Sequence, residues 1–389
     1  MSASQRLQVA VVGGGTMGLA AAWALARRGQ QVSLFERCGH VHDQGSHGGH
    51  TRIIRHAYHE GSDYVDLVSR ADRLWTELGQ RGGTELLVRC GLLEFGPPTH
   101  PEFVAAREAL REHGIAHQSL TPAQARERGP FLIPDDWEAC FSPDSGYLRV
   151  RPCLDALRRE AEAAGAVLRH HSEVRALVNS SESADGRPGL VLADGSTVHA
   201  DRIVVAAGAL AAELLPAVVA RRPLTVLRRV LAWTDVDLRD MPCWAAFAPE
   251  GFFYGFPGND EGVGEGVSGC KLACHIASDP ALAWMNDASD PRAVEREIQA
   301  RDLAPLEDFI ARYFPAAGKP TTAKTCLYTN SESGDFCIDL HPEDERVVIA
   351  AGFSGHGFKF APIIGEILAD LSVDGRSELC LPRFRIARS

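Results

Sequence analysis

The chain has 389 residues and a mass of 42.1 kDa, with 45% hydrophobic and 23% charged residues. These values are typical of a globular protein of about two domains and exclude a disordered, collagen-like or coiled-coil chain. With 40 Lys and Arg against 51 Asp and Glu, the formal net charge is −11, which argues against binding of nucleic acid or of an anionic membrane.

The N-terminal sequence predicts a β–turn–α–β unit. A strand over residues 7–12 is followed by a glycine-rich turn, an alanine-rich helix that ends near Arg28, and a second strand over residues 31–35. Glu36 stands at the end of this second strand, 18 residues after the last glycine of the turn. This order of elements is typical of Rossmann-like dinucleotide-binding domains and predicts an α/β fold.

The turn itself has the spacing Gly-x-Gly-x-x-Gly. Gly13 permits the tight turn, Gly15 lets a pyrophosphate approach the backbone, and Gly18 lets the helix pack against the strand. The helix N-terminus offers free N–H groups and a positive dipole to the phosphates. Glu36 can accept hydrogen bonds from the ribose hydroxyls and would repel a ribose phosphate, so the motif disfavours an NADP-like ligand. The alternative interpretation is a glycine-rich turn in an unrelated α/β domain.

The segment over residues 40–59 is rich in glycine and histidine. Its six histidines match no standard spacing of metal ligands, and we predict no metal there. A glycine-rich loop that packs against a ligand is the simpler interpretation. Arg52 and Arg55 lie in this segment, and their spacing of three would place both guanidinium groups on one face if this stretch were a helical turn.

The later elements alternate between helices and strands. The predicted elements are a helix over 62–78, a strand over 88–95, one helix and a proline-rich loop within 98–130, a helix near 152–164, a strand over 167–178, a hairpin over 189–198, a strand over 202–209 and a strand-rich segment over 216–322. A strand over 347–351 then leads through a glycine loop into a helix that ends near Ser372. This second strand–loop–helix unit could direct another helix N-terminus at the same ligand.

These elements predict two interleaved domains. Residues 1–90, 151–215 and 323–389 are expected to form a Rossmann-like FAD-binding domain, and residues 91–150 and 216–322 an α+β substrate domain with an antiparallel sheet. Such interleaving suits an FAD enzyme better than a nicotinamide-dependent dehydrogenase, in which the nucleotide domain is usually contiguous.

The cysteines and the N-terminus bear on the compartment. Ten cysteines are scattered along the chain without a CxxC pair, which predicts buried thiols in a reducing environment. The first six residues leave no room for a secretory leader, and the apolar run over 203–215 is shorter than the ~20 residues of a membrane span. We therefore expect a cytoplasmic protein.

Several stretches beyond the glycine motif make the chain similar to a known family. They are Gly45–His47, Thr51–Tyr58, Tyr254–Pro257, Lys271, Cys326–Thr329, Ile338–Pro342 and Ala351–Phe360. From end to end the chain resembles monomeric sarcosine oxidase and N-methyltryptophan oxidase, within the wider glycine/D-amino-acid oxidase family of flavoproteins. The resemblance implies FAD as the cofactor, a secondary amine with a carboxylate as the substrate, O₂ as the acceptor and a monomeric protein. The loop departs from the family pattern, because Gly48 replaces a His and His50 replaces an Asp.

The resemblance implies oxidation of the N-methyl group of a sarcosine-like amino acid to an imine, which gives formaldehyde, the primary amino acid and hydrogen peroxide. One alternative is a bulkier or cyclic secondary amino acid such as N-methyltryptophan, pipecolate or proline, because Ala245 and Ala246 leave room before the strand of Tyr254. A nicotinamide-dependent dehydrogenase is a third hypothesis, disfavoured by the second glycine loop. A binding module without activity would leave the matched residues unexplained.

The resemblance also implies roles for individual residues. Lys271 would promote the reaction with O₂, and Arg52 would lie near the flavin ring. Tyr254 and His275 would line the amine end of the pocket. The expected substrate-binding residues are Arg55, Lys359 and Tyr328. Cys326 would attach covalently to the flavin. The expected FAD-binding residues are Gly13, Gly15, Thr16, Met17, Gly18, Glu36, Arg37, Ser46, Thr51, Arg52, Val174, Gly208, Cys326, Gly355, Gly357, Phe358 and Lys359.

Overall fold

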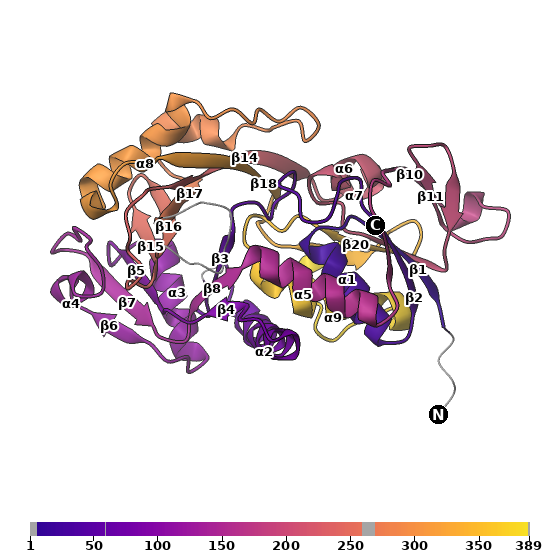
Figure 1. Cartoon of the computed structure of the whole chain (residues 1–389), viewed down its shortest axis with the longest axis horizontal. Coiled ribbons are helices and arrows are strands. Elements are labelled where there is room, and N and C mark those ends of the chain that lie inside the picture. The colour runs from indigo at the N-terminus through magenta and orange to yellow at the C-terminus, as the bar shows by residue number, and fades with distance from the viewer. Residues whose placement is uncertain (1–5, 59, 259–268, 388–389) are drawn as a thin grey trace. The chain divides into compact units, whose positions relative to one another are not determined.

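A computed structural model of the chain describes residues 6–58, 60–258 and 269–387. These residues form two compact units, each built from separate stretches of the chain (Figure 1). The first unit comprises Met1–His47, Cys153–Val226 and Tyr328–Ser389, and the second comprises Gly48–Pro152 and Leu227–Leu327. Residues 48–90, which the sequence analysis assigns to the FAD-binding domain, belong by their contacts to the second unit.

The first unit contains a six-stranded sheet in the order β19-β20-β13-β1-β2-β9. Its strands are β1 (Gln8–Val12), β2 (Gln31–Phe35), β9 (Val167–Arg169), β13 (Arg202–Val205), β19 (Cys337–Leu340) and β20 (Val347–Ala351). All neighbours pair in parallel except β19, which is antiparallel to β20. The central strands are almost wholly apolar and buried, as expected for a parallel sheet that is covered on both faces. The α/β prediction is confirmed for this unit.

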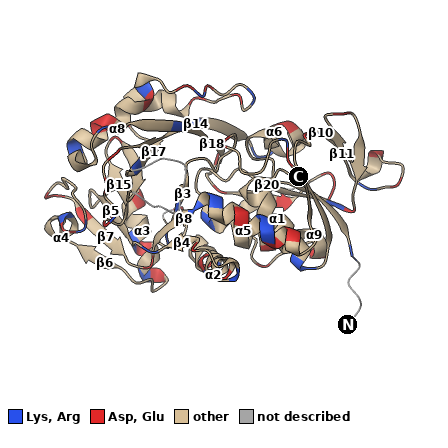
Figure 2. Cartoon of the chain, viewed as in Figure 1, with Lys and Arg blue, Asp and Glu red and all other residues tan. Residues whose placement is uncertain are grey.

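Two apolar helices pack against this sheet and against each other, α1 (Thr16–Arg27) and α9 (Ala361–Asp374) (Figure 1). Their close approach depends on small residues, because a Cβ at Gly365 would overlap the carbonyl of Ala20. Other helices are amphipathic: Figure 2 shows acidic and basic residues interspersed along α5 (Val150–Ala163). On this helix Arg158 and Glu162 form an ion pair at 2.6 Å. The short helices α6 (Ala211–Leu214) and α7 (Pro216–Val219) follow β13.

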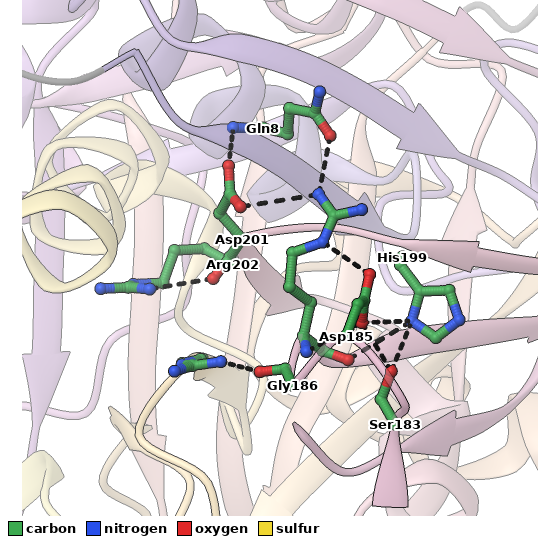
Figure 3. Close-up of polar contacts among 9 residues, drawn as sticks. Gln8, Ser183, Asp185, Gly186, His199, Asp201 and Arg202 are labelled. Atoms are coloured by element: carbon green, nitrogen blue, oxygen red, sulfur yellow. Dashed lines mark hydrogen bonds and ion pairs between the residues drawn. The ribbon is translucent and has the colours of Figure 1, made fainter. Parts of the chain in front are cut away.

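A small antiparallel sheet of β10 (Val174–Val178), β11 (Gly189–Leu192) and β12 (Thr197–His199) extends the first unit. A polar cluster links its loops to β1, where Asp201 accepts a 2.8 Å bond from the Gln8 amide and Asp185 accepts a 2.7 Å bond from Ser183 (Figure 3). The predicted strand over 167–178 is wrong as a single element. The chain turns at His171, whose φ is 53°, so β9 and β10 enter different sheets.

The second unit contains an eight-stranded sheet in the order β18-β14-β17-β16-β15-β5-β7-β6. Its strands are β5 (Leu92–Gly96), β6 (Gln118–Leu120), β7 (Glu138–Ser142), β14 (Leu224–Trp233), β15 (Cys243–Ala248), β16 (Gly251–Phe256), β17 (Lys271–Ala277) and β18 (Thr322–Ser331). A second sheet pairs β3 (Thr51–Ile54), β8 (Gly146–Arg149) and β4 (Leu87–Val88). The helices are α2 (Tyr64–Gly82), α3 (Pro101–Glu112), α4 (Pro122–Arg126) and α8 (Ala300–Tyr313). Most pairings in the large sheet are antiparallel, as predicted, and β5–β15 is parallel.

Strand register separates the two faces of the eight-stranded sheet. Trp244 packs against Phe309 of α8 with stacked rings 5.3 Å apart, which defines the α8 face. Phe247 packs against Phe103 of α3 on the opposite, α3 face. Because successive residues of a strand point to opposite faces, Ala245 lies on the α3 face and Ala246 on the α8 face. Our prediction that both alanines enlarge one pocket is therefore corrected to Ala245 alone.

Other differences from the predicted elements arise at glycines and prolines. The strand predicted over 88–95 is interrupted at Gly91, whose φ is 77°, so β4 and β5 belong to different sheets. The region 98–130 contains two helices and a strand rather than one helix. The helix predicted over 62–78 is confirmed, as are the hairpin near 189–198 and the helix before Ser372. All ten cysteines are free thiols and eight are buried. Among the described helices, none combines the length and apolar character that crossing a bilayer requires.

Candidate functional site

The predicted nucleotide-binding residues of the first unit gather at one edge of its sheet. The glycine turn follows β1, Glu36 follows β2, Gly208 follows β13, and the loop that contains Gly355 follows β20. Because these four strands are parallel, their carboxyl ends meet at the same edge. This is the edge at which open α/β sheets bind ligands.

The glycine turn has the close contacts that its sequence predicts. Gly13 has a φ of 97°, and a Cβ there would overlap the carbonyl oxygen of Ala206. A Cβ at Gly18 would overlap the carbonyl oxygen of Gly13. No side chain of the described structure caps α1, and its first turn, which contains Thr16 and Met17, has no acidic residue. The amide groups of this turn are therefore available to phosphate oxygens, as binding of the FAD pyrophosphate requires.

Glu36 is held as a buried carboxylate at the end of β2. It is 6% exposed, and its two oxygens accept bonds of 2.6 Å from the Gly14 amide and 2.7 Å from the Cys38 amide. Burial alone would raise the pKa of Glu36, but the bonds from His42 and from these amides outweigh it and lower the pKa to about 2. The carboxylate is thus fixed in the charged form that accepts hydrogen bonds from ribose hydroxyls.

The same carboxylate belongs to a small group with metal-ligand geometry. The ligand atoms of Glu36, Cys38 and His42 lie within 4.8 Å of one another. Both Glu36 oxygens already accept amide hydrogen bonds, and burial followed by the Glu36 charge raises the pKa of the Cys38 thiol. The prediction that no metal binds stays a prediction. One of the six histidines considered for it, His59, lies outside the described residues.

The glycine loop after β20 is tightly packed. Gly355 has a φ of 78°, and a Cβ there would overlap the ring of Tyr328. Ser354 has a φ of 48°, an uncommon value for a residue with a side chain. Lys359 is 5% exposed, and its Nζ donates a 2.8 Å bond to the carbonyl of His356. Gly357 and Phe358 lie in the same loop, immediately before α9. The loop therefore holds a buried cation in a fixed backbone frame.

Lys271 is the most deeply buried cation among the predicted site residues. It opens β17 and is 2% exposed, and its Nζ donates bonds of 2.7 Å to the carbonyls of Gly49 and Thr51. The Nζ also lies 4.4 Å from the ring centre of Phe256 and 5.9 Å from that of Trp233. Burial, followed by the charge of Arg52, lowers the pKa of Lys271 well below its ordinary value. The two hydrogen bonds from Nζ hold the Lys271 side chain and the loop that carries Gly49 in place against each other.

Arg52 and Cys326 lie in the electrostatic field of the same lysine. Arg52 donates bonds of 2.6 Å to the Gly48 carbonyl and 2.8 Å to the Thr51 carbonyl. Cys326 on β18 is buried, which raises the pKa of its thiol, whereas the charges of Arg52 and Lys271 act to lower it. The structure therefore brings together Arg52, Lys271 and Cys326, three residues that the resemblance placed near the flavin.

Arg55 lies in a different local structure from the one that its spacing to Arg52 suggested. Arg52 lies within the strand β3 and Arg55 immediately follows that strand, so the two arginines are not on a helical turn. The possibility of one shared helical face is therefore excluded. Arg55 is buried, and its NH2 group lies 2.9 and 3.0 Å from the two oxygens of Glu60. It also donates to the Ala57 carbonyl and lies 4.7 Å from the ring centre of Tyr58.

Tyr254 and His275 meet on the α3 face of the eight-stranded sheet. Their ring centres are 6.3 Å apart, and both side chains are partly buried. Tyr254 pairs in register with Ala245 on one side and Ala273 on the other, and Phe256 pairs with Lys271. Tyr254 and Lys271 are therefore presented on the same face of one sheet.

The remaining predicted residues are dispersed. Arg37 and Ser46 lie between β2 and His47, where the first stretch of the first unit ends. Val174 is the first residue of β10. Their roles stay predictions.

Sequence reasoning missed two acidic residues, Glu60 and Glu94. Glu60 pairs with Arg55, and Glu94 is buried in β5 within the run Leu92-Leu93-Glu94-Phe95. A single acid inside an apolar strand was the signal that could have identified Glu94.

The comparisons with known proteins agree with this geometry. Residues 8–371 match the family described as DAO, FAD dependent oxidoreductase. The chain is 36% identical to monomeric sarcosine oxidase of Bacillus sp. (strain B-0618), covering 99% of this chain and 97% of the relative. It is 32% identical to N-methyl-L-tryptophan oxidase of Yersinia pestis (strain Pestoides F), covering 97% and 98%.

Solved structures show the same fold. NikD, an unusual amino acid oxidase essential for nikkomycin biosynthesis, superimposes with a TM-score of 0.83 at 27% identity, covering 98% of both chains. Glycine oxidase from Geobacillus kaustophilus superimposes with a TM-score of 0.77 at 24% identity, covering 99% of both chains. The family match spans most of the chain and includes the glycine turn, Glu36 and the loop after β20. The chain therefore belongs to the DAO family of FAD-dependent oxidoreductases.

Proposed function

We propose that this protein is a flavoprotein oxidase of secondary amino acids that oxidises the N-methyl group of a sarcosine-like substrate. The products would be an imine that hydrolyses to formaldehyde and the primary amino acid, and hydrogen peroxide from O₂. The observation that carries the proposal is the grouping of Lys271, Arg52 and Cys326 in the second unit. Sequence similarity over nearly the full chain to sarcosine oxidase and N-methyltryptophan oxidase supports the proposal. The nicotinamide alternative is disfavoured, since the family uses FAD.

Binding of the substrate carboxylate is proposed for Arg55 and Lys359. Both side chains are buried and cationic, and a guanidinium can bind a carboxylate with two parallel hydrogen bonds. Glu60 occupies the Arg55 guanidinium in the structure, so we propose that the substrate carboxylate replaces Glu60 there. Burial near fixed cations disfavours a further ammonium, which lowers the pKa of the bound amine and prepares it for oxidation without a dedicated base.

The FAD, when bound, supplies the two-electron acceptor for this oxidation. Lys271 is proposed to stabilise the negative charge that develops when O₂ is reduced, because it is a buried cation held by two carbonyl acceptors. Cys326 is proposed as the point of covalent attachment, and the charges of Arg52 and Lys271 favour its thiolate. Tyr254 and His275 are proposed to contact the amine end of the substrate.

A bulkier or cyclic secondary amino acid is the second candidate substrate. Ala245 pairs in register with Tyr254 on the α3 face, and its methyl group is among the smallest side chains that this position could carry. This observation favours substrates with a side chain over sarcosine itself.

The test compares substrates and one variant. Anaerobic mixing with sarcosine, N-methylalanine, N-methyltryptophan, pipecolate or proline should bleach the flavin, and aerobic turnover should release peroxide. Arg55→Gln should raise KM for these carboxylates. It should leave KM for the amide of sarcosine unchanged, because the amide has no carboxylate that Arg55 could bind. A protein whose flavin is reduced by none of the five amino acids would refute the proposal.

A further inference from the structure

Glu94 is a buried acid without a hydrogen-bond partner for one oxygen. It lies on β5 and is 1% exposed, and within the described structure its Oε1 receives no hydrogen bond. Burial of an unpaired polar group is costly, and such groups are rare in folded proteins. An apolar residue would stabilise this strand, so the carboxyl group needs an explanation beyond the fold.

The position of Glu94 links it to the proposed substrate site. Glu94 pairs in register with Ala245, and Ala245 pairs with Tyr254, so the three residues form one row across β5, β15 and β16. Residues at paired positions point to the same face of a sheet, here the α3 face that also presents Lys271. Adjacent strands are about 4.8 Å apart, so the backbones of Glu94 and Tyr254 are separated by roughly 10 Å. The residue between them in this row, Ala245, has only a methyl side chain.

The ionisable groups around Glu94 include more acids than bases, which favours the approach of a further cation. Arg55 is the cation whose charge stabilises the Glu94 carboxylate, and Glu60, whose charge opposes it, already forms two hydrogen bonds with Arg55. Glu102, in the first turn of α3, also lies in the field of Glu60 and Arg55. Among these four described groups, carboxyl groups outnumber guanidinium groups three to one. A positive group that enters beside Glu94 would be attracted and would satisfy the free oxygen.

We propose that Glu94 is a specificity-determining residue whose free oxygen accepts a hydrogen bond from an ammonium or other N–H group at the end of the substrate side chain. This inference rests on the proposed function and narrows its substrate class to secondary amino acids with a basic or N–H-bearing side chain. Sarcosine, which has no side chain, would fill the carboxylate and amine positions and leave Glu94 unpaired.

The alternative is a purely structural role, in which Glu94 helps to hold Arg55. The two roles differ in what they predict for ligands. A structural role affects every carboxylate ligand equally, because all of them bind Arg55. A role in side-chain recognition affects only ligands with a terminal N–H group.

The experiment measures equilibrium binding, so it does not depend on turnover. The flavin-loaded, full-length protein is titrated with butanoate, pentanoate and hexanoate, and with the same chains bearing a terminal amine, while the flavin spectrum or the heat of binding is followed. These ligands lack an N-methyl group. A charge-assisted hydrogen bond predicts that the best amine-bearing chain binds about tenfold to a hundredfold more tightly than its plain counterpart.

Two variants test the assignment. In Glu94→Gln the preference for the terminal amine should fall to about twofold or less, while affinity for the plain carboxylates is retained. Glu102→Gln is the matched control, because it removes a nearby carboxyl from α3 and should keep most of the preference. A wild-type protein that binds no amine-bearing chain more tightly, or a preference that survives in Glu94→Gln, would overturn the proposal.

The outcome separates this inference from the proposed function. Failure of the flavin to be reduced by any secondary amino acid would refute the oxidase activity, whereas a wild-type protein without an amine preference in these titrations would refute only the role of Glu94. The wild-type comparison remains decisive if Glu94→Gln does not fold, which thermal unfolding would reveal.

Discussion

Replacement of Glu36 by glutamine should destabilise the protein by an amount that the structure lets us estimate. Glu36 is 6% exposed, and amide bonds of 2.6 and 2.7 Å hold its two oxygens. The pKa falls from 4.5 to about 2, which at 1.4 kcal/mol per tenfold change corresponds to about 3 kcal/mol. A glutamine side chain keeps one acceptor oxygen, but its amide NH2 group would face a backbone N–H. One hydrogen bond of the carboxylate is therefore replaced by a repulsive contact between two donors. We expect a loss of about 3 kcal/mol in the free energy of unfolding at pH 7.

The lowered pKa of Glu36 also predicts how this loss of stability changes with pH. A carboxyl with a lowered folded-state pKa stabilises the protein fully above its unfolded pKa of 4.5, and this stabilisation is lost as the pH falls toward 2. The difference between wild type and Glu36→Gln should therefore be largest at neutral pH and should shrink on acidification. Urea titrations of both proteins at pH 7 and near pH 3.5, at matched flavin content, measure this difference in unfolding free energy at each pH without adding salt.

Glu94→Gln provides the matched comparison, because the same substitution should have the opposite effect. Burial raises the pKa of Glu94 to about 7, so its carboxylate destabilises the folded state increasingly as the pH rises from 4.5 through 7. Glu94→Gln should be neutral near pH 4 and should stabilise the protein above pH 7 by up to about 3 kcal/mol. Equal effects of the two substitutions, or effects that do not change with pH, would refute the assignment of Glu36 as a fixed carboxylate and Glu94 as an unpaired one.

Three further predictions concern the flavin. Gly18→Ala should abolish flavin loading, because its Cβ would overlap the Gly13 carbonyl, and the ratio of flavin to protein absorbance measures this. Acid precipitation should leave the flavin in the protein pellet of the wild type and release it from Cys326→Ala, whereas release from both would reduce Cys326 to a structural thiol. Lys271→Met should slow reoxidation of the reduced flavin by roughly a thousandfold, since a cation about 4 Å from a new anion contributes about 4 kcal/mol at an effective dielectric constant of about 20. Reduction by substrate should change much less, and the exposed Lys319→Met serves as control, so equal reoxidation rates in the two variants would contradict this role.

Local sequence was sufficient where the backbone itself dictates the structure. Gly13 and Gly18 stand where a Cβ would overlap a backbone carbonyl, and the element order around this turn predicted the parallel sheet and the position of Glu36. The second glycine loop was predicted for the same reason. Where a single residue reverses the chain, as at Gly91 and His171, the apolar pattern continues across the break, and prediction therefore merged two strands into one.

The sequence alone determined the family-like motifs, the Rossmann-type unit and the identity of most candidate site residues. Tertiary structure decided which of them meet. Lys271 bonds to the Gly49 carbonyl across 222 positions of the chain, and the sheet register places Glu94 two strands from Tyr254. Such pairings depend on strand register and on burial, which short-range periodicity does not specify. For the same reason, only the folded chain reveals that Glu94 is buried without a partner for one of its oxygens.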